Sequence, residues 1–338
     1  MPSPPVGRWH DDGVTADATE VFQQHRPVLD GVAYRMLGRV ADAEDVVQEA
    51  WLRWSKADRE QVREPRGYLV RVTTRLALDR LRQAQARREA YVGSWLPEPL
   101  VTDLLPGASR DTEDGAERAM LAESVSLAVL VVLESLSPLE RAVFVLREAF
   151  GFPYAEIAQT LERSEAAVRQ LAGRARRHVA ERRPRFDVDP ALQRELTERF
   201  LKAAVDGDLT GLVGLLAPDV RLVSDSGGRA KAPRRVITGV EKVGRFLAAV
   251  GPEGRQAGLA FRFLELNGGQ AVLAVDGGRP DSVITVDVVD GLIQAVYLIR
   301  NPDKLAHLDG RAAGQPSAHR PDAVPYSPPA TRSTAPEV

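Results

Sequence analysis

Cysteine is absent from this chain of 338 residues, which excludes disulfide bonds and thiolate metal sites. The longest apolar run, Leu127 to Leu133, is far too short to span a membrane. The first residues lack a basic stretch followed by an apolar one, so we expect no secretory signal. Together these absences fit a protein of the reducing cytoplasm.

The net charge is also small, at −2, which by itself argues against a nucleic-acid partner. Binding to a polyanion depends on local patches, however, and the chain contains two. Residues 66–88 hold seven arginines against one acid, and residues 164–183 hold six arginines against two acids. A basic run is either a solvated helix face or a phosphate-binding surface, and the presence of two such runs favours the second interpretation.

Proline, glycine and the period of the apolar residues divide the chain into segments. The pattern predicts a multidomain protein with two all-helical domains, a linker between them, and a final α+β domain with strand-like alternation. Both ends have the composition of disordered chain. The expected boundaries are 1–16 disordered, 17–92 helical, 93–115 linker, 116–186 helical, 187–308 α+β and 309–338 disordered.

Start signals for three helices lie between residues 137 and 183. Ser137 and Glu140 can form a capping box, Gly151 ends that helix, Pro153 begins a short one, and Ser164 caps a third. A short helix, a turn and a basic helix form a helix-turn-helix, which places its second helix in the major groove, although a plain helical hairpin is the alternative. The residues expected to contact DNA are Arg169 and Gln170 at base edges and Arg174, Arg176 and Arg177 at phosphates.

The segment 137–180 resembles the region-4 domain of extracytoplasmic-function (ECF) sigma factors, which reads the −35 promoter element. The resemblance implies that the third helix is the −35 recognition helix. The chain keeps the family's residues at Val168, Arg169, Arg174, Ala175 and Arg176, and departs from them at Ala167, Gln170, Leu171 and Gly173. These departures leave the base preference open.

The stretch from Val40 to Trp54 has an apolar face and an acidic face at helical spacing. By itself this pattern indicates a core helix with a solvated acidic side. The sequence of this stretch resembles region 2 of sigma factors, where such a helix docks on the clamp helices of the largest polymerase subunit. Acidic residues steer association with a basic partner. The residues that the resemblance assigns to polymerase are Asp42, Asp45, Gln48 and Glu49.

A loop and a further helix follow, and the helix carries an arginine stripe at spacings of four and seven. By resemblance, this loop and helix bind the −10 element, whose unstacked bases require a pocket flanked by positive charge. Trp54 and Tyr68 either stack on bases or belong to the core. The arginines assigned to the −10 element are Arg71, Arg75, Arg80 and Arg82.

The element order of residues 187–308 resembles the SnoaL-like members of the cone-shaped α+β fold shared with nuclear transport factor 2. Some proteins of this fold are enzymes, but the five histidines all lie outside the predicted sheet. Acid–base chemistry would fall to carboxylates such as Asp225, Glu265 or Asp287, which show no sign of converging. We expect two helices in 187–217, one over 240–250, and strands over 219–225, 256–266, 270–276, 282–289 and 292–300.

Three short motifs resemble those of sigma factors with a fused SnoaL-like domain, in which they form a domain interface and the extension modulates activity. The second motif is equally typical of a tight turn, and the third of a helix start. An ion pair between Glu98 and Arg279 could cross the interface. The motifs are Trp95, Leu96, Pro97 and Glu98, continuing to Leu100; Asp276, Gly277, Gly278 and Arg279, continuing to Pro280; and Asn301, Pro302 and Asp303, continuing to Leu305.

The sequence therefore predicts a cytoplasmic sigma factor that binds RNA polymerase core and promoter DNA, without membrane, cofactor or metal, and that catalyses nothing itself. Its C-terminal domain would restrain the two DNA-reading domains, as a separate anti-sigma protein often does. Whether that domain binds a ligand stays open. Two alternatives remain: a conventional regulator that uses only the helix-turn-helix, and an enzyme with a DNA-binding appendage.

Overall fold

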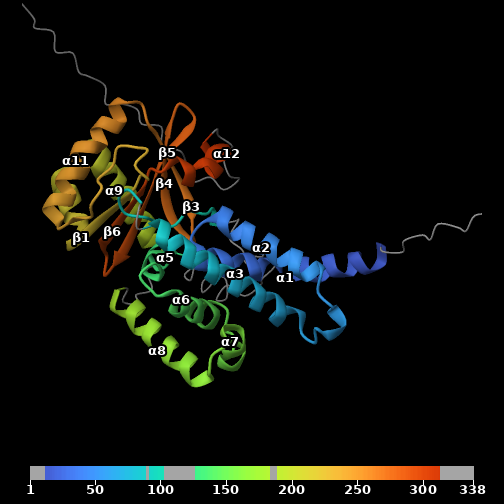
Figure 1. The fold of residues 1–338 in the computed structure, drawn as a ribbon. Helices are drawn as coiled ribbons and strands as arrows, with labels where there is room; N and C mark the ends of the chain where they lie inside the picture. Colours follow the sequence, from blue (N-terminus) through green and yellow to red (C-terminus); the bar gives the residue numbers. More distant parts are fainter. Residues whose placement is uncertain (1–11, 89–90, 103–125, 183–188, 313–338) are drawn as a thin grey trace, which may run out of the picture.

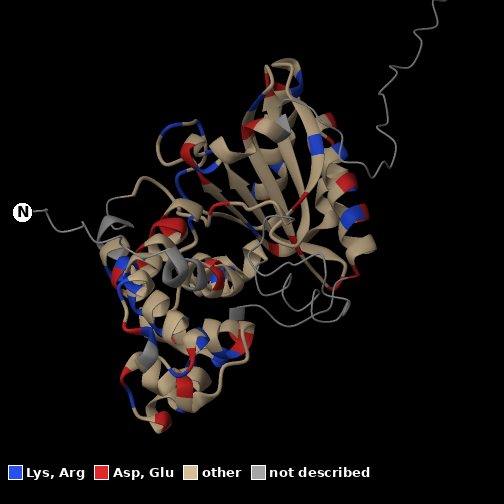
Figure 2. Ribbon diagram, turned by 90° about the vertical axis from the view of Figure 1, so that its right-hand side faces the viewer, with Lys and Arg blue, Asp and Glu red and all other residues tan. Residues whose placement is uncertain are grey.

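The computed structural model describes residues 12–88, 91–102, 126–182 and 189–312. Two helical domains lie against one another, and a mixed sheet with its own helices lies beside them (Figure 1). The predicted fold class, two all-α domains followed by an α+β domain, is confirmed. Charged residues are frequent on the helices and loops and fewer along the strands (Figure 2).

The first helical domain is a three-helix unit. The helices α1 and α2 pack on one another and on α3, and buried apolar residues line the contacts. Helix α1 begins inside the segment predicted to be disordered, so that boundary was wrong at residues 12–16. The elements are α1 (Asp12–Leu37), α2 (Val40–Ser55), the 3₁₀ turn η1 (Arg59–Gln61) and α3 (Pro65–Arg88).

The second helical domain contains the predicted helix-turn-helix. Residues 116–125 of the expected block lie outside the described residues, and the described part begins at Ser126, which caps its first helix. The elements are α5 (Leu127–Leu133), α6 (Pro138–Phe144), the π-helical turn η3 (Val145–Ala149), α7 (Tyr154–Leu161) and α8 (Glu165–Arg182).

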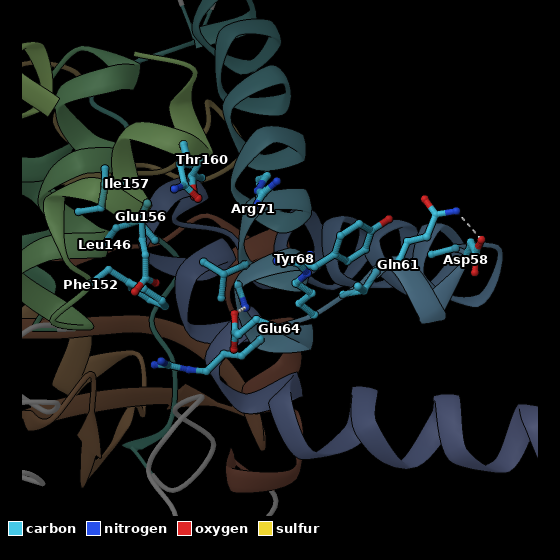
Figure 3. Close-up of a pocket in the computed structure, with 17 residues that line it drawn as sticks. Asp58, Gln61, Glu64, Tyr68, Arg71, Leu146, Phe152, Glu156, Ile157 and Thr160 are labelled. Atoms are coloured by element: carbon cyan, nitrogen blue, oxygen red, sulfur yellow. Dashed lines mark hydrogen bonds between the residues drawn. The ribbon is translucent and has the colours of Figure 1, made fainter. Parts of the chain in front are cut away.

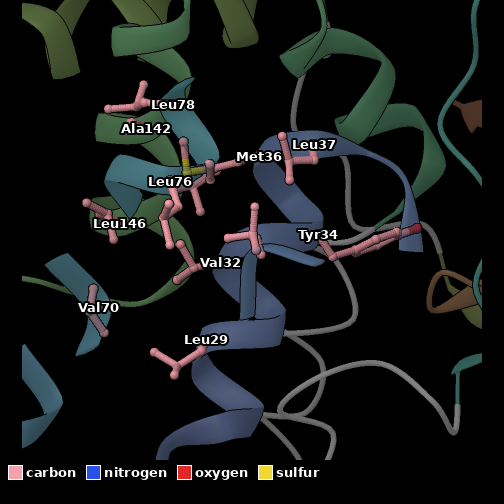
Figure 4. Packing of buried hydrophobic residues seen from close by; sticks show 14 of the residues in the cluster. Leu29, Val32, Tyr34, Met36, Leu37, Val70, Leu76, Leu78, Ala142 and Leu146 are labelled. Atoms are coloured by element: carbon pink, nitrogen blue, oxygen red, sulfur yellow. The ribbon is translucent and has the colours of Figure 1, made fainter. Parts of the chain in front are cut away.

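The two helical domains share one hydrophobic core. Apolar residues of α1 and α3 are in the same buried cluster as residues of α6, η3, α7 and α8. Figure 4 shows Val32 of α1 beside Leu76 of α3, with Leu146 of the second domain on the same side of α1. Helix α3 also packs directly against α6 and α7. We call this packing of the first domain on the second the closed arrangement.

The C-terminal domain is a six-stranded mixed sheet in the order β2-β1-β6-β5-β4-β3, in which only the β1–β6 pair is parallel. The predicted strand at 256–266 begins late because helix α11 continues to Gln256, and the short β2 was not predicted. The elements are α9 (Pro190–Asp206), α10 (Leu209–Leu215), β1 (Leu216–Asp225), β2 (Ile237–Thr238), α11 (Val240–Gln256), β3 (Ala260–Leu266), β4 (Gly269–Asp276), β5 (Arg279–Val289), β6 (Leu292–Ile299), η4 (Pro302–Lys304), η5 (Ala306–Leu308) and α12 (Asp309–Ala312).

Both faces of this sheet are covered, by different parts of the chain. One face packs on α9, α10 and α11. The other face packs on Leu96 and Val101 of the linker, on the start of α5 and on the C-terminal turns. Val101 also forms an antiparallel bridge with Leu266 at the edge strand β3. The linker and α5 thus join the helical half to the sheet.

Within the described residues, every helix is too short or too polar to cross a membrane. The predicted disordered tail also begins with one helical turn, α12, at Asp309–Ala312. Residues beyond this turn lie outside the described part of the chain.

Candidate nucleic-acid interface

The helix-turn-helix has the boundaries that its capping residues dictate. The Ser137 hydroxyl accepts the backbone N–H of Glu140, and the Glu140 carboxylate accepts that of Ser137, so the predicted capping box is present. Gly151, with φ of 67°, follows the first helix where the sequence predicts its end. Glu162 adopts φ of 53° in the turn, and the Ser164 hydroxyl caps α8.

Tyr154, the first residue of α7, organises three arginines beside the recognition helix. The guanidinium carbons of Arg147 and Arg169 each lie 4.7 Å from the centre of its ring, and Arg176 donates to its hydroxyl over 2.9 Å. Arg169 also pairs with Glu165 over 2.5 Å. The Arg169 guanidinium, which the sequence predicts to read bases, is therefore held against α7 and α8 by Tyr154 and Glu165. The role of Tyr154 was missed, because an aromatic at a helix start carries no such signal alone.

The remaining predicted DNA-contacting residues on α8 differ in whether their side chains already bond to other residues of the protein. The Arg174 guanidinium donates to Glu140 over 2.9 Å, whereas Gln170 and Arg177 are exposed. Hydrogen bonds from Ser137 and then from Arg174 hold the pKa of the Glu140 carboxyl below its ordinary value. On the exposed face of α8, Gln170 and Arg177 are thus directly accessible to DNA. Arg169, Arg174 and Arg176 would have to exchange their contacts within the protein for contacts with DNA.

Arg75, in the middle of the predicted −10 stripe, is bound to the second helical domain. Its Nε donates to the carbonyl oxygen of Thr160 over 3.0 Å, and its Nη2 lies 3.0 Å from the carboxylate of Glu162. Both partners belong to the end of α7 and the turn after it. In the closed arrangement this arginine therefore contacts protein where the prediction has it contact DNA.

The other arginines of the stripe have separate environments. Arg80 pairs with Asp45 over 2.5 Å and with Asp42 over 3.3 Å. Arg82 is exposed and pairs with Asp79 over 3.1 Å. Arg80 therefore joins the residues predicted for the −10 element to those predicted for polymerase, a contact between α3 and α2 that spacing alone did not suggest.

The acidic face of α2 is exposed as predicted. Asp45, Gln48 and Glu49 are exposed, while Asp42 is partly covered by Arg80. Leu52 lies on the same face, at the helical spacing of i+7 from Asp45, and is 50% exposed. The sequence prediction missed this leucine, although its position in the acidic stripe was readable. The face therefore combines negative charge with one exposed apolar side chain.

Trp54, also on α2, faces the core, where its indole N–H donates to the carbonyl oxygen of Ala18 over 2.9 Å. This burial removes Trp54 from the candidate base-stacking residues.

Guanidinium groups also cross the contact between the two helical domains. Arg35 of α1 lies 4.9 Å from the centre of the Phe150 ring, and Arg141 of α6 donates to the carbonyl oxygen of Met36 over 2.8 Å. Burial lowers the pKa of Arg35 to about 10 and that of Arg141 to about 9, which expresses the cost of taking charge out of water. Gly31 permits the approach, because a Cβ there would lie 2.9 Å from the Phe150 ring.

A cleft of about 860 Å³ separates the loop before α3 from η3 and α7 (Figure 3). Figure 3 shows Asp58, Gln61 and Tyr68 on its first-domain side and Glu156 on its second-domain side. Tyr68 is half-buried, with its ring 5.7 Å from that of Trp54. Arg71 lines the cleft, and its buried Nε has no hydrogen-bond partner in the described part of the chain. The cleft exists only while the two domains are packed together.

The linker is fixed to the C-terminal domain by a buried ion pair, which we call the linker anchor. Lys304 lies 2.6 Å from the Asp225 carboxylate and also donates to the carbonyl oxygen of Leu96, and both charged residues are almost fully buried. The Asp225 carboxylate accepts three further hydrogen bonds, from the Tyr91 hydroxyl at 2.6 Å, the Leu96 N–H at 2.8 Å and the Gly227 N–H at 3.1 Å. The ammonium lies 4.0 Å from the centre of the Trp95 ring. Burial, and then the Asp225 carboxylate, raise the pKa of Tyr91.

Glu98 connects the linker to the other two domains. Its carboxylate accepts the backbone N–H of Val40 over 3.1 Å and lies 3.3 Å from His307, whereas the expected partner was Arg279. Its carbonyl oxygen accepts the hydroxyl of Tyr34 over 2.8 Å. That expected ion pair is wrong, because Glu98 is buried beside α2 whereas Arg279 is exposed on a hairpin.

The three predicted interdomain motifs have different positions. Trp95 to Glu98 lie in the described part of the linker, residues 91–102, and contact the C-terminal domain. Pro97 is buried between Leu96 and Glu98. Asn301 donates to the Tyr91 hydroxyl over 2.8 Å and caps η4 at Pro302 and Asp303. Asp276, Gly277, Gly278 and Arg279 instead form an exposed turn between β4 and β5.

The carboxylates considered for catalysis do not form a group. The Asp225 oxygens are occupied by the linker anchor. Glu265 is exposed on the edge strand β3, 3.9 Å from Arg194, and Asp287 lies on β5. In the described part of the chain, no cluster of three or more His, Asp or Glu side chains could hold a metal ion.

The fold and the site together define a protein with two helical domains packed on one another, the second of which carries a helix-turn-helix, followed by an α+β domain. The sequence matches the Sigma-70 region 2 family over residues 21–87 and the Sigma-70 region 4 family over residues 126–179. It is 44% identical over 295 residues to the ECF RNA polymerase sigma factor SigJ of Mycobacterium tuberculosis, covering 84% of this chain and 91% of that protein.

Two further comparisons agree. The probable ECF sigma factor SigI of M. tuberculosis is 34% identical, covering 87% of this chain and 96% of that protein. The crystal structure of M. tuberculosis SigJ matches with a TM-score of 0.66 at 39% identity, covering 85% of this chain and 98% of that one. The chain therefore belongs to the ECF RNA polymerase sigma factors, which direct polymerase to promoters and are not enzymes. Membership of this family sets aside both the conventional regulator and the enzyme.

Proposed function

We propose that this sigma factor reads the −35 element with α8 and the −10 element with α3 and its preceding loop, in the cytoplasm, and that its C-terminal domain restrains both readers. The observation that carries the proposal is the contact of Arg75 with the end of α7. A residue of the −10 surface is thereby occupied by the −35 domain. The closed arrangement is a resting state that must open before promoter binding.

The geometry of promoter DNA supports this proposal. The −35 and −10 elements are about 25 base pairs apart, which corresponds to roughly 85 Å of duplex. The two helical domains, by contrast, share one core, and Arg75 lies 3.0 Å from Thr160 across their contact. Domains packed in this way cannot reach both elements at once. Separation of α3 from α6 and α7 is therefore part of promoter recognition.

The linker anchor supplies the restraint. The linker leaves the first helical domain and leads toward the second, and its residues 95–101 are held against the sheet. Glu98 adds contacts to α1 and α2 through Tyr34 and Val40. A linker that is fixed at its middle has less reach than a free chain of the same length. The C-terminal domain thereby favours the closed arrangement without covering α8.

We also propose that the exposed face of α2 docks on the clamp helices of polymerase's largest subunit. Asp45 and Glu49 supply charge that steers a basic partner, and Leu52 supplies an apolar anchor on the same face. Arg80 competes for Asp42 and Asp45 in the closed arrangement. Docking on polymerase would exchange these intramolecular ion pairs for intermolecular ones.

Transcription from a reconstituted holoenzyme tests the proposal, with promoters first mapped from transcript 5′ ends after overexpression. The double variant Phe150→Ala, Glu162→Gln removes the ring beside Arg35 and the partner of Arg75, and leaves the proposed DNA-contacting side chains intact. Weakening the closed arrangement by 1–2 kcal/mol shifts the population by roughly 5- to 30-fold, so output should rise severalfold.

The matched control is Phe246→Ala, which truncates a half-buried ring within the C-terminal domain. Output equal to wild type from the double variant would refute the closed arrangement as a resting state that limits promoter binding. Absence of any promoter-specific transcript with the wild-type chain would refute the sigma assignment itself.

A further inference from the structure

The loop of residues 226–236, between β1 and β2, is strongly basic. It contains Arg229, Lys231, Arg234 and Arg235 and no acidic residue. Neither basic helix of the sigma domains includes it, and the DNA-reading surfaces described above do not use it. All four of these side chains are exposed.

Hydrogen bonds fix the backbone of this loop. Arg300 donates to the carbonyl oxygen of Lys231 over 2.7 Å and pairs with Asp281 over 2.6 Å. The Ser224 hydroxyl donates to the carbonyl oxygen of Pro233 over 2.5 Å. The charged side chains are thus presented from an ordered backbone, so that less conformational entropy is lost when they bind a partner.

Three of the four cations have no counter-charge within the described part of the chain. Arg229 pairs with Asp303 over 2.7 Å. No carboxylate of the described residues lies within 4.0 Å of Lys231, Arg234 or Arg235, and none of the three has an ion pair. Like charges held close together on a fixed loop repel one another. An external polyanion would relieve that repulsion.

The position of the loop relates it to the −10 helix. The chain leaves α3 and reaches Val92 and Gly93, and the loop packs on both. A Cβ on Gly228 would lie 3.2 Å from the side chain of Val92, and one on Gly93 would lie 3.8 Å from the backbone of Arg234. The basic loop therefore lies just beyond the end of the helix that carries the arginine stripe.

We propose that residues 229–236 bind the phosphate backbone of duplex DNA as a third contact of this sigma factor with its promoter. Recognition of single strands uses aromatic side chains for stacking, and protein interfaces use aromatic anchors, and this loop has none. Contacts to phosphates need only fixed cations and a small, open backbone. The inference rests on membership of the sigma family and not on the proposed restraint by the C-terminal domain.

Salt dependence of DNA binding by the full chain tests this contact. The variant Lys231→Gln, Arg234→Gln, Arg235→Gln is compared with Arg199→Gln, Lys242→Gln, Arg245→Gln, which removes the same charge from exposed sites on α9 and α11. The probe is a fluorescent 30-base-pair duplex of arbitrary sequence, titrated between 50 and 200 mM NaCl. Loss of three phosphate contacts should lower the slope of log K against log salt by roughly 2 to 3 in the loop variant, and leave the control near wild type.

With that difference in slope, the ratio of the wild-type binding constant to that of the loop variant should fall roughly 40-fold between 50 and 200 mM NaCl. Equal slopes for wild type and the loop variant would overturn the proposal. Equal losses in both variants would also overturn it, because net charge would then be the cause. Unchanged DNA binding with weakened binding to core polymerase would assign the loop to a protein partner instead.

Discussion

Asp225 and Lys304 show how much a single pair of side chains can decide in this molecule. Both are almost fully buried, and each has additional hydrogen-bond partners in the linker. A buried ion pair contributes little net stability, yet the loss of one partner leaves an uncompensated charge. The pair therefore makes the position of the linker specific, because only the anchored linker satisfies both charges.

A double-mutant cycle checks this role. Lys304→Met should destabilise the C-terminal domain by about 3–5 kcal/mol, because Asp225 stays buried without its partner. Asp225→Asn combined with Lys304→Met should recover most of that loss, since no buried charge remains. Urea unfolding of the full chain, followed by far-ultraviolet circular dichroism, measures both. Additive losses in the double variant would contradict a coupled pair.

Few of these pairings were readable from the sequence. The motif around Lys304 was predicted to belong to an interface, but its partner Asp225 lies 79 residues away and was weighed only as a candidate acid. Similarly, Glu98 was assigned to the interface but given the wrong partner. Residue identity and spacing mark which side chains are unusual, whereas tertiary packing decides what they contact.

At the scale of single elements, local signals predicted more. Capping residues and turn residues located α6, α7 and α8, since these signals act within a few residues of the chain. Boundaries that depend on long-range packing were less accurate, as at the start of α1 and the end of α11. The −10 role of α3 was predicted from its resemblance to sigma region 2, but the packing of α7 on α3 was not predicted.

The helix α8 yields a direct test of the predicted phosphate contacts. Replacing Arg174 and Arg176 with alanine should weaken binding to duplex DNA and lower its salt slope by about 2, because two phosphate contacts are lost. Both arginines already contact Glu140, Glu148 or Tyr154, so the loss in affinity should be moderate. Arg199→Ala, on α9, serves as the control. A slope equal to wild type would assign these arginines to the packing of the domain alone.

For the molecule as a whole, the sequence predicted the order and class of the domains correctly. Region 2, the linker, region 4 and the α+β domain each have a local composition or period that is visible without a structure. Their mutual packing has no such signature. One core joins both helical domains, and the linker crosses the sheet, because apolar residues from distant segments meet there.

The closed arrangement must open for promoter recognition. Förster resonance energy transfer between labels on the two helical domains measures this opening most directly. The chain has no cysteine, so Gln83→Cys and Glu181→Cys, both at exposed sites on α3 and α8, allow specific labelling. We expect high transfer in the free chain and a large fall in the complex with core polymerase and promoter DNA, where the elements are roughly 85 Å apart. Transfer that stays the same on forming the promoter complex would contradict the account.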